Sequence, residues 1–572
     1  MHSCLICTPT VGNYYIGEMM NERMRVTRQV MILRRSNPLP MNAKPGYEML
    51  SCLVSTQTLG QLHISEINNP AKPMNTFIHL ILIASCIFIQ SCSTPKADQK
   101  VSRNPIAQEN EHEGTTDWLI DVPYKTCEYP DHQNCRRENI EGYCSHTSIT
   151  TGDTLGIFVS TNPVTKYNID IYRMGYYGGK GGRHMRSFHN LQGKQQITPQ
   201  ADAKTNFLEC NWDTAVSFMI PNEWISGVYL GKLTALNDSS QAYVVFIVKD
   251  ERPVDFVFQC SDLTWQAYNR WPQWHSMYDE GQKPWVNTNG ARISFDRPYS
   301  LYVNNLPSDF NPLSNGAGEF LLWEFPLAFW MEKEGYDVSY ISNTDTHANP
   351  SLLLRSKAFL SVGHDEYWTP EMFTNVSSAR DQGVNLLFLS GNSVDGTVYL
   401  ERSEDGRPNR TTGRLPQRDF DNEQDLMGAS SYGVGYCAFV CKQPDHWVYE
   451  GTGMKLNDSI PDLVGWEYHG LPTGNNEGLT ILAQKKPPVN RFTNDNPSDH
   501  ASTIYTTQKG NFVFNAGTCW WSMVLSAPPG YKNPVCNLGR DGYRVIDFSK
   551  GDPRVQQMTK NLFNKVVRSD EL

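Results

Sequence analysis

The sequence lacks the motifs of several common hydrolases. It contains no His-Glu-x-x-His motif and no Gly-x-Ser-x-Gly elbow, which argues against zincin and serine-hydrolase chemistry. No cysteine lies near Gly363 and His364, at the turn after an apolar run, so thiol catalysis is not expected there. The body of the chain also lacks an extended basic block. With a formal net charge of −10, it is not expected to bind nucleic acid.

No apolar stretch reaches the length of a membrane-spanning helix. The run from Phe77 to Ile89 has 13 residues, which is too short to cross a bilayer but suits the core of a signal peptide. Cys92 follows it at a position that resembles the processing site of bacterial lipoproteins, where the cysteine becomes the lipidated N-terminus. Cys86 fits the local pattern even better, but apolar residues follow it, so we favour Cys92.

These features predict how the N-terminal part is organised. Residues 1–73 show no sustained periodicity and are expected to be a mis-called upstream extension, with Met74 as the true start. Residues 74–92 would be the signal peptide, and residues 93–139 a polar tether with a Cys-rich loop. The protein would then be an exported lipoprotein of the bacterial cell envelope, attached to the membrane only through its lipid anchor. Export permits disulfides, but the nine cysteines after Cys92 are an odd number, so at least one is unpaired if all bonds are internal.

The remaining chain is rich in residues that build cores. Apolar residues make up 39% and aromatic residues 11% of the 572 residues, which supports two or more folded domains. Residues 140–250 contain short apolar or alternating runs between Gly, Asn, Asp and Pro, a pattern typical of an antiparallel β-sandwich. The Gly-rich segment 175–183 lacks the Gly-Lys-Ser/Thr ending of a phosphate-binding loop, so we interpret it as a turn between strands.

Residues 251–572 are predicted to be a second, α/β domain. Apolar runs predict three strands in it, at residues 337–341, 357–362 and 384–389. A helix is expected at 370–380, with Thr369 as its N-cap. Strands that alternate with helices imply right-handed crossovers and a parallel sheet. A long amphipathic helix is also expected over 316–335, kinked at Pro326.

Polar residues follow each of the three predicted strands. Because ligands bind at the carboxyl ends of parallel strands, these residues would meet at one edge of the sheet. They are Asp345 and His347, then His364 and Glu366, then Asn392. Each of them alone could simply cap a turn. As a set, with His and Glu two residues apart, they predict a functional site.

A metal ion is the most economical way to activate water with such side chains. Carboxylate and phenolate oxygens favour a hard cation, which for tyrosinate usually means ferric iron. The residues that bear on this centre also carry a family resemblance. Five segments together resemble the N,N-dimethylformamidase large (beta) subunit family, and they are His364–Trp368, Ser390–Asn392, Thr264–Asn269, Ser294–Tyr299 and Tyr172–Gly179.

That resemblance implies a β-sandwich followed by an amidotransferase-like α/β domain. It also implies a mononuclear ferric site with two tyrosinates and one glutamate, which hydrolyses a small amide. Glu366 would be the glutamate ligand, with Tyr268 and Tyr299 as the tyrosines. Tyr278 and Tyr302 are close enough in sequence to Tyr299 to leave the second tyrosine open.

The resemblance also assigns the residues around the metal. His364 and Asn392 would orient the substrate carbonyl, and Glu467 is the candidate general base that moves a proton from water to the departing amine. Thr411 and Thr412 stand where an active-site lysine of the family would be sought. This departure puts dimethylformamide itself in doubt as the substrate.

Two alternatives stay open. One is a cell-surface lipoprotein without catalysis, which would bind glycans or another ligand by stacking on its many Trp and Tyr side chains. The other is a hydrolase of the same fold that uses another metal or cleaves another amide-like bond. The expected partner is a small-molecule amide, with no nucleic acid, and a homo-oligomer is left open.

Overall fold

The computed structural model describes ten parts of the chain, which are residues 104–120, 136, 138–279, 291–300, 315–416, 420, 422–473, 478–488, 498–537 and 543–568. These parts belong to one compact unit that includes Asn104–Leu572. The predicted upstream extension and signal peptide lie outside the described residues, as do Cys127, Cys135 and Tyr302. Within the described residues, no helix is both long and apolar enough to cross a membrane.

Part of the expected tether is folded. Residues Pro105–Glu109 form helix α3, which Asn104 caps by accepting a hydrogen bond from the backbone of Ala107. Ile106 and Trp118 are fully buried in the largest hydrophobic cluster. The polar composition of this segment predicted a solvated linker, but its few apolar side chains are enough to anchor it to the folded unit.

Two antiparallel-rich sheets follow. The first, in the order β1-β3-β6, contains Ile140–Cys144, Thr154–Thr161 and Thr214–Met219. The second, in the order β2-β8-β7-β4-β5, contains Ser148–Thr150, Gln241–Lys249, Gly227–Ala235, Tyr167–Met174 and Gly182–Leu191. Buried residues of both sheets form one cluster, because alternate side chains along a strand face the same side. The Gly-rich segment is a turn between β4 and β5, as predicted, with Gly178 and Gly179 at positive φ.

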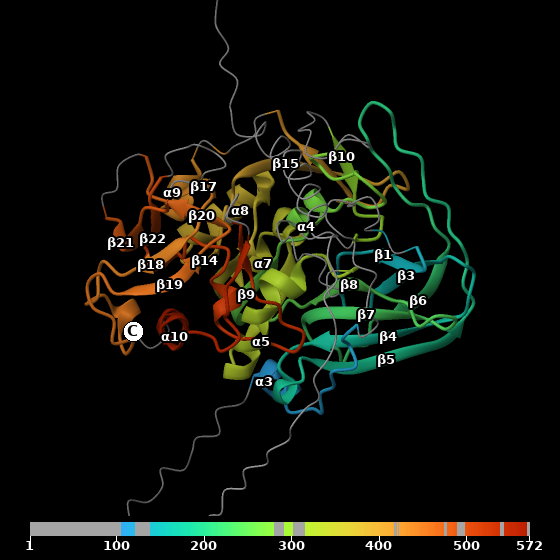
Figure 1. Ribbon diagram of the computed structural model, residues 1–572, viewed down its shortest axis with the longest axis horizontal. Coiled ribbons are helices and arrows are strands. Elements are labelled where there is room, and N and C mark those ends of the chain that lie inside the picture. The colour runs from blue at the N-terminus through green and yellow to red at the C-terminus, as the bar shows by residue number, and fades with distance from the viewer. Residues whose placement is uncertain are drawn as a thin grey trace, which may run out of the picture. The chain divides into compact units, whose positions relative to one another are not determined.

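The next sheet has nine strands and a parallel core. Its main path runs β11-β9-β12-β14-β23-β22-β20-β17, and β21 pairs with β22. The parallel strands are β11 (Val338–Ser342), β9 (Val254–Cys260), β12 (Ser356–His364), β14 (Asn385–Gly391) and β23 (Phe512–Asn515). The antiparallel strands are β22 (His500–Thr506), β20 (Glu467–Gly470), β17 (Ser430–Val434) and β21 (Thr480–Lys485). In Figure 1, β9 of the parallel core lies between strands β3–β8 on the right and the antiparallel strands β21 and β22 on the left.

Smaller sheets complete the β-structure. A four-stranded sheet runs β10 (Arg292–Ser294), β16 (Thr411–Arg414), β15 (Gly396–Glu401) and β13 (Tyr367–Trp368). Two hairpin-like pairs are β18 (Cys437–Val440) with β19 (Ser459–Val464), and β24 (Val535–Asn537) with β25 (Tyr543–Val545). The prediction of a mixed α/β protein with both parallel and antiparallel sheets is confirmed, and strands make up more of it than helices.

The helices are short, except for two. They are α4 (Asp262–Tyr268), α5 (Phe325–Glu334), α6 (Asn343–Ala348), α7 (Ser351–Leu354), α8 (Pro370–Asp381), α9 (Glu423–Met427) and α10 (Pro553–Val567), with single turns η6 (Trp447–Tyr449) and η7 (Ser522–Val524). Helix α8 begins where the sequence predicted, and the Thr369 side chain accepts a hydrogen bond from the backbone N–H of Met372. Helix α10 has Asp552 as its N-cap and ends in a basic turn, which suits the helix dipole.

The long helix expected over 316–335 is confirmed only over 320–334, where the chain forms two consecutive helical segments. A π-helical segment, η5 (Phe320–Glu324), precedes α5, and Pro326 lies in the first turn of α5. Proline has no N–H to give to a preceding turn, but it fits the first turn of a helix, so it starts a helix here rather than kinking one. Nor is the segment amphipathic, because its side chains are buried from Phe320 to Glu332.

A buried ion pair joins strand β4 of the five-stranded sheet to helix α5. Arg173 in β4 and Glu332 in α5 are each fully buried, and Arg173 Nη2 lies 2.9 Å from Glu332 Oε1. The second carboxylate oxygen of Glu332 accepts from Arg173 Nη1 and Asn110 Nδ2, while Tyr340 donates to the first. The seven described cysteines are buried free thiols, so none of them forms a disulfide.

Candidate active site

The carboxyl end of β12 makes a sharp turn into the residues that the sequence singled out. Gly363 has a φ of 69°, and a Cβ atom there would come within 2.5 Å of Trp323 Cβ. Only glycine accepts both the left-handed backbone and this close packing. The turn sets His364 and Glu366 on the side of α4, and their side chains are almost fully buried.

The two acids after His364 have different roles. Asp365 is surrounded by donors, since it accepts hydrogen bonds from Gln259 Nε2, Ser361 Oγ and Asn343 Nδ2 at 2.7, 2.9 and 3.0 Å. It therefore ties β9, β12 and α6 together. Glu366 instead faces a group of phenols, and its backbone N–H donates to Thr264 Oγ1. The structure thus separates an anchoring carboxylate from one that is available for chemistry.

Two tyrosines contact Glu366. Tyr268, the last residue of α4, donates to Glu366 Oε2 at 2.6 Å, and Tyr278 OH lies 3.2 Å from Oε1. The two phenol oxygens are 2.8 Å apart, and their rings stack at 4.8 Å. Burial alone would raise the pKa of Glu366, but His364 and Tyr268 outweigh it and hold that pKa below its usual value.

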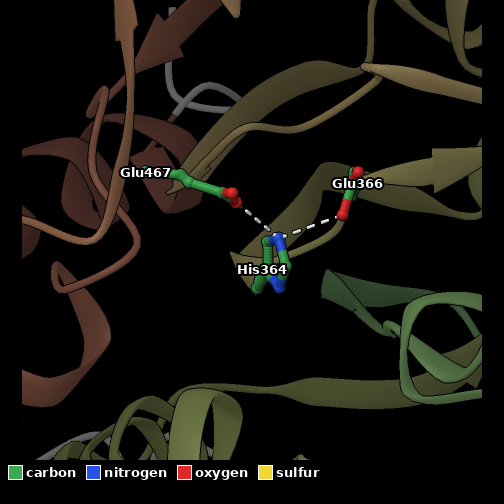
Figure 2. Close-up of side chains that lie close together, drawn as sticks. All are labelled: His364, Glu366 and Glu467. Atoms are coloured by element: carbon green, nitrogen blue, oxygen red, sulfur yellow. Dashed lines mark ion pairs between the residues drawn. The ribbon is translucent and has the colours of Figure 1, made fainter. Parts of the chain in front are cut away.

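His364 lies between two carboxylates. Figure 2 shows its ring between Glu366 and Glu467, with Nε2 3.3 Å from Glu366 Oε2 and 2.8 Å from Glu467 Oε2. These are ion pairs by distance only, because neither ring nitrogen nor Glu467 Oε2 has a hydrogen bond of acceptable alignment. Burial works against the charged imidazole, but the two acids, Glu467 first, raise the pKa of His364 well above its usual value. Burial raises the pKa of Glu467.

Asn392 reaches the same cluster from the end of β14. It is buried, has a φ of 53°, and its side chain lies beside the Glu467 carboxyl, where it works to lower the pKa that burial raises. Gly391 lets the strands approach, since a Cβ there would lie 2.3 Å from the carbonyl oxygen of Glu467. Trp466, directly before Glu467, also has a left-handed backbone with a φ of 46°. Such uncommon conformations concentrate at functional sites.

Tyr367 and Arg414 contact Tyr278. The hydroxyl of Tyr367 contacts that of Tyr278 and accepts from Arg414 Nη2 at 2.6 Å. The Arg414 guanidinium lies over the Tyr278 ring, 4.4 Å from its centroid. Tyr367 belongs to the segment after β12 that carries the family resemblance, whereas Arg414 was not predicted as a site residue. A usable signal was the alternation along β16, which places Arg414 on the same side of the strand as Thr412.

The structure brings together five of the six residues predicted for the site, namely Tyr268, His364, Glu366, Asn392 and Glu467. Tyr299 lies elsewhere among the described residues: it packs against Trp265 and lines a small cavity with Arg297, Arg410 and His146. Tyr278, named in the sequence only as an alternative, lies beside Glu366 instead.

Other predicted rim residues have structural roles. Asp345 closes a capping box with Ser342 at the start of α6, and it also contacts Lys249. His347 Nδ1 lies 2.9 Å from Thr369 Oγ1, the N-cap of α8. Both residues therefore act at helix N-termini, as the simpler interpretation predicted.

The donor set can accommodate a cation. Ligand atoms of His364, Glu366 and Glu467 all lie within 4.8 Å of one another, and two phenols adjoin Glu366. Carboxylate and phenol oxygens suit a hard ion. The residues therefore fit a hard, oxygen-bound metal.

A buried group of carboxylates, an imidazole and phenols at the carboxyl ends of parallel strands has the character of an enzyme active site. A comparison with known protein families assigns the chain to a family. Residues 168–534 match the family described as N,N-dimethylformamidase beta subunit-like, C-terminal, and the chain belongs to that family. This confirms the resemblance predicted from the five segments. No curated protein matches the chain.

Proposed function

We propose that the protein is a hydrolase of a small amide or amide-like C–N bond and that it uses a single ferric ion. Membership of the family supports the reaction class. The observation that carries the metal proposal is the convergence of Tyr268, Tyr278 and Glu366, whose oxygens meet within 2.6–3.2 Å. Three oxygen donors from separate segments would be a costly arrangement to bury for packing alone.

In this proposal Glu366, Tyr268 and Tyr278 would hold the ion, with Tyr278 in the role predicted for Tyr299. The ion would supply Lewis-acid polarisation of the scissile carbonyl. Glu366 suits the role because its pKa is held low, so it is ionised at neutral pH. Burial and Glu366 raise the pKa of Tyr278, and Arg414, stacked over its ring, counteracts them by placing a positive charge against the phenol.

Glu467 is the proton carrier. It accepts a proton from the attacking water as the oxygen adds to the carbonyl carbon, and returns that proton to the amine nitrogen as the C–N bond breaks. The products are a carboxylic acid and an amine. A buried carboxyl with a raised pKa suits this exchange better than an exposed one.

His364 and Asn392 position the reacting groups. His364, held as a cation between two carboxylates, keeps Glu467 in place at 2.8 Å and offers positive charge to an oxygen that becomes negative. Asn392 holds the Glu467 carboxyl by its amide. Both side chains are locked by burial, so little reorganisation is needed during the reaction.

The test compares two tyrosines. Tyr278→Phe should lower iron content and weaken the colour expected from tyrosinate-to-iron charge transfer, whereas Tyr299→Phe, the matched control, should leave both unchanged. Glu366→Ala should abolish bound iron. Iron would be measured by elemental analysis and colour by visible absorption. Full iron retention in Glu366→Ala would refute the ligand set, and a colourless, metal-free wild-type protein would favour the binding-protein alternative.

A further inference from the structure

The turn that presents Asn392 is held in an uncommon backbone conformation. Asn392 and Val394 both have positive φ values, of 53° and 58°, although neither is glycine. The turn follows β14 directly, so its shape decides where the Asn392 side chain points. Left-handed residues of this kind persist only where surrounding contacts hold them. The contacts that do so here therefore act on the site.

His469 makes one of these contacts. The backbone N–H of Ser393, the residue between the two strained positions, donates to His469 Nε2 at 2.8 Å. On the other side of the ring, Nδ1 lies 2.9 Å from Asn515 Oδ1. The ring is fully buried. The imidazole thus bridges the turn after β14 to the end of the neighbouring strand β23.

Strand β20 contacts the turn through two of its side chains. Glu467 and His469 are two residues apart on this strand, so their side chains leave it on the same side. The first meets the side chain of Asn392, and the second meets the backbone of Ser393. Strand β20 therefore carries Glu467 and, through His469, also holds the turn that carries Asn392.

The hydrogen bonds also fix the protonation form of His469. A backbone N–H can only donate, so Nε2 must accept and carries no proton. A ring nitrogen must then hold the proton at Nδ1, where it donates to the Asn515 carbonyl oxygen. A ring protonated at Nε2 would set two N–H groups against each other and release the turn.

We propose that His469, as the neutral ring protonated at Nδ1, is a positioning residue that holds the Asn392 turn and so fixes the contact of Asn392 with Glu467. It acts only through these residues and does not itself touch the reacting atoms. The inference about activity rests on the proposed hydrolase function, whereas the hydrogen-bond arrangement does not.

The activity test uses two variants and a matched control. His469→Leu removes the acceptor and should lower kcat about 10- to 100-fold with little change in KM, as losses of supporting contacts do. His469→Gln keeps an acceptor and a donor and should restore most of that loss. The control is His500→Leu, an equally buried histidine in the adjoining strand β22, which should change kcat less than about 3-fold.

A double mutant separates positioning from general damage. If His469 acts through Asn392, then His469→Leu added to Asn392→Ala should lower kcat by less than about 3-fold, far less than in the wild type. Fully additive losses would overturn the proposal. So would equal losses in His469→Leu and His500→Leu, because they would show a general effect of an apolar substitution.

The tautomer can be tested without any activity. In protein labelled with ¹⁵N at histidine, long-range ¹H–¹⁵N spectra should show one buried ring protonated at Nδ1 alone, and its signals should disappear in His469→Gln. A ring protonated at Nε2, or doubly protonated at neutral pH, would refute the proposed contact. This measurement holds even if no amide is hydrolysed or if His469→Leu does not fold, so it distinguishes failure of this inference from failure of the proposed function.

Discussion

Two buried ionic clusters in this protein differ in how completely their polar atoms are paired. At the seam between β4 and α5, Glu332 accepts hydrogen bonds from Arg173, Asn110 and Tyr340, all between 2.8 and 3.0 Å. At the strand ends, His364 lies as close to Glu467, yet both of its ring nitrogens lack an aligned partner.

The difference separates a structural role from a chemical one. A buried charge that is fully hydrogen-bonded has no capacity left for a ligand, and its value lies in fixing how two parts of the chain pack. A buried polar group without a partner is costly to folding, and here it lies among carboxylates and phenols that could share a ligand with it. The ion-pair distances of the two clusters are nearly equal, at 2.9 and 2.8 Å, and the clusters differ in how many of their polar atoms are hydrogen-bonded.

The largest effect is expected at the unpaired cluster. Glu366→Gln keeps the size of the side chain but removes its charge, so iron should be lost and turnover should fall by at least about 10³-fold, the scale for removal of a key group at a reaction centre. Thermal unfolding of the metal-free proteins should shift modestly downward, because His364 and Tyr268 favour the ionised carboxylate that is lost, while Glu467 still faces His364. A variant that keeps both iron and turnover would contradict the assignment.

The opposite pattern is expected at the seam. Glu332→Gln leaves Arg173 buried without a full counter-charge, which should lower the free energy of unfolding by about 3–5 kcal/mol. The iron content of the folded fraction should not change. Urea unfolding measures the first quantity and elemental analysis the second. Iron loss without destabilisation would reverse the comparison between the clusters.

Local patterns were sufficient to predict most of the site. Glycine, polar and apolar residues at the ends of β12 and β14 indicated a parallel sheet with His364, Glu366 and Asn392 at one edge, and this is where they lie. The HxE spacing works because alternate residues at a strand end project to the same side. Glu467, 101 residues beyond Glu366 in a strand with weak periodicity, came only from the family resemblance.

The second tyrosine could not be chosen from sequence because the choice depends on loop geometry. Tyr278 and Tyr299 are both in aromatic-rich sequence, but only the course of the chain after α4 turns Tyr278 toward Glu366. Arg297 helps to set that course by donating to the carbonyls of Trp271 and His275. Long-range hydrogen bonds of this kind leave no periodic signal. The π-helical turn before Pro326 was missed for the same reason.

Acid should weaken the fold through its buried neutral histidines. Burial lowers the pKa of His500 to about 3, below its usual value of 6.5. The unfolded chain therefore binds a proton below about pH 6.5 that the folded chain does not, and stability falls as the pH drops toward 3, by about 1.4 kcal/mol per pH unit. Urea unfolding at pH 6 and pH 5 should show His500→Leu losing about 1 kcal/mol less than wild type. Equal losses would mean that His500 is charged in the fold.

Arg414 should have a smaller effect, on metal affinity. Arg414→Gln removes the charge stacked on Tyr278, so iron binding should weaken about 10-fold and the charge-transfer band should shift, while Arg414→Lys should fall between. Chelator competition measures the affinity. An unchanged band in Arg414→Gln would show that the guanidinium supports packing and does not act on the phenol.

The smallest effect is expected from an ion pair that belongs to neither cluster. Lys194 and Asp213 are in contact, but their side chains are 62% and 68% exposed. Water and salt screen such a pair, and holding two mobile side chains together offsets most of its attraction. Asp213→Asn should therefore change the free energy of unfolding by no more than about 0.5 kcal/mol in urea melts. A larger loss would mean that proximity alone stabilises an ion pair in this protein. The two buried clusters would then be expected to contribute similarly to stability, because their ion-pair distances are similar.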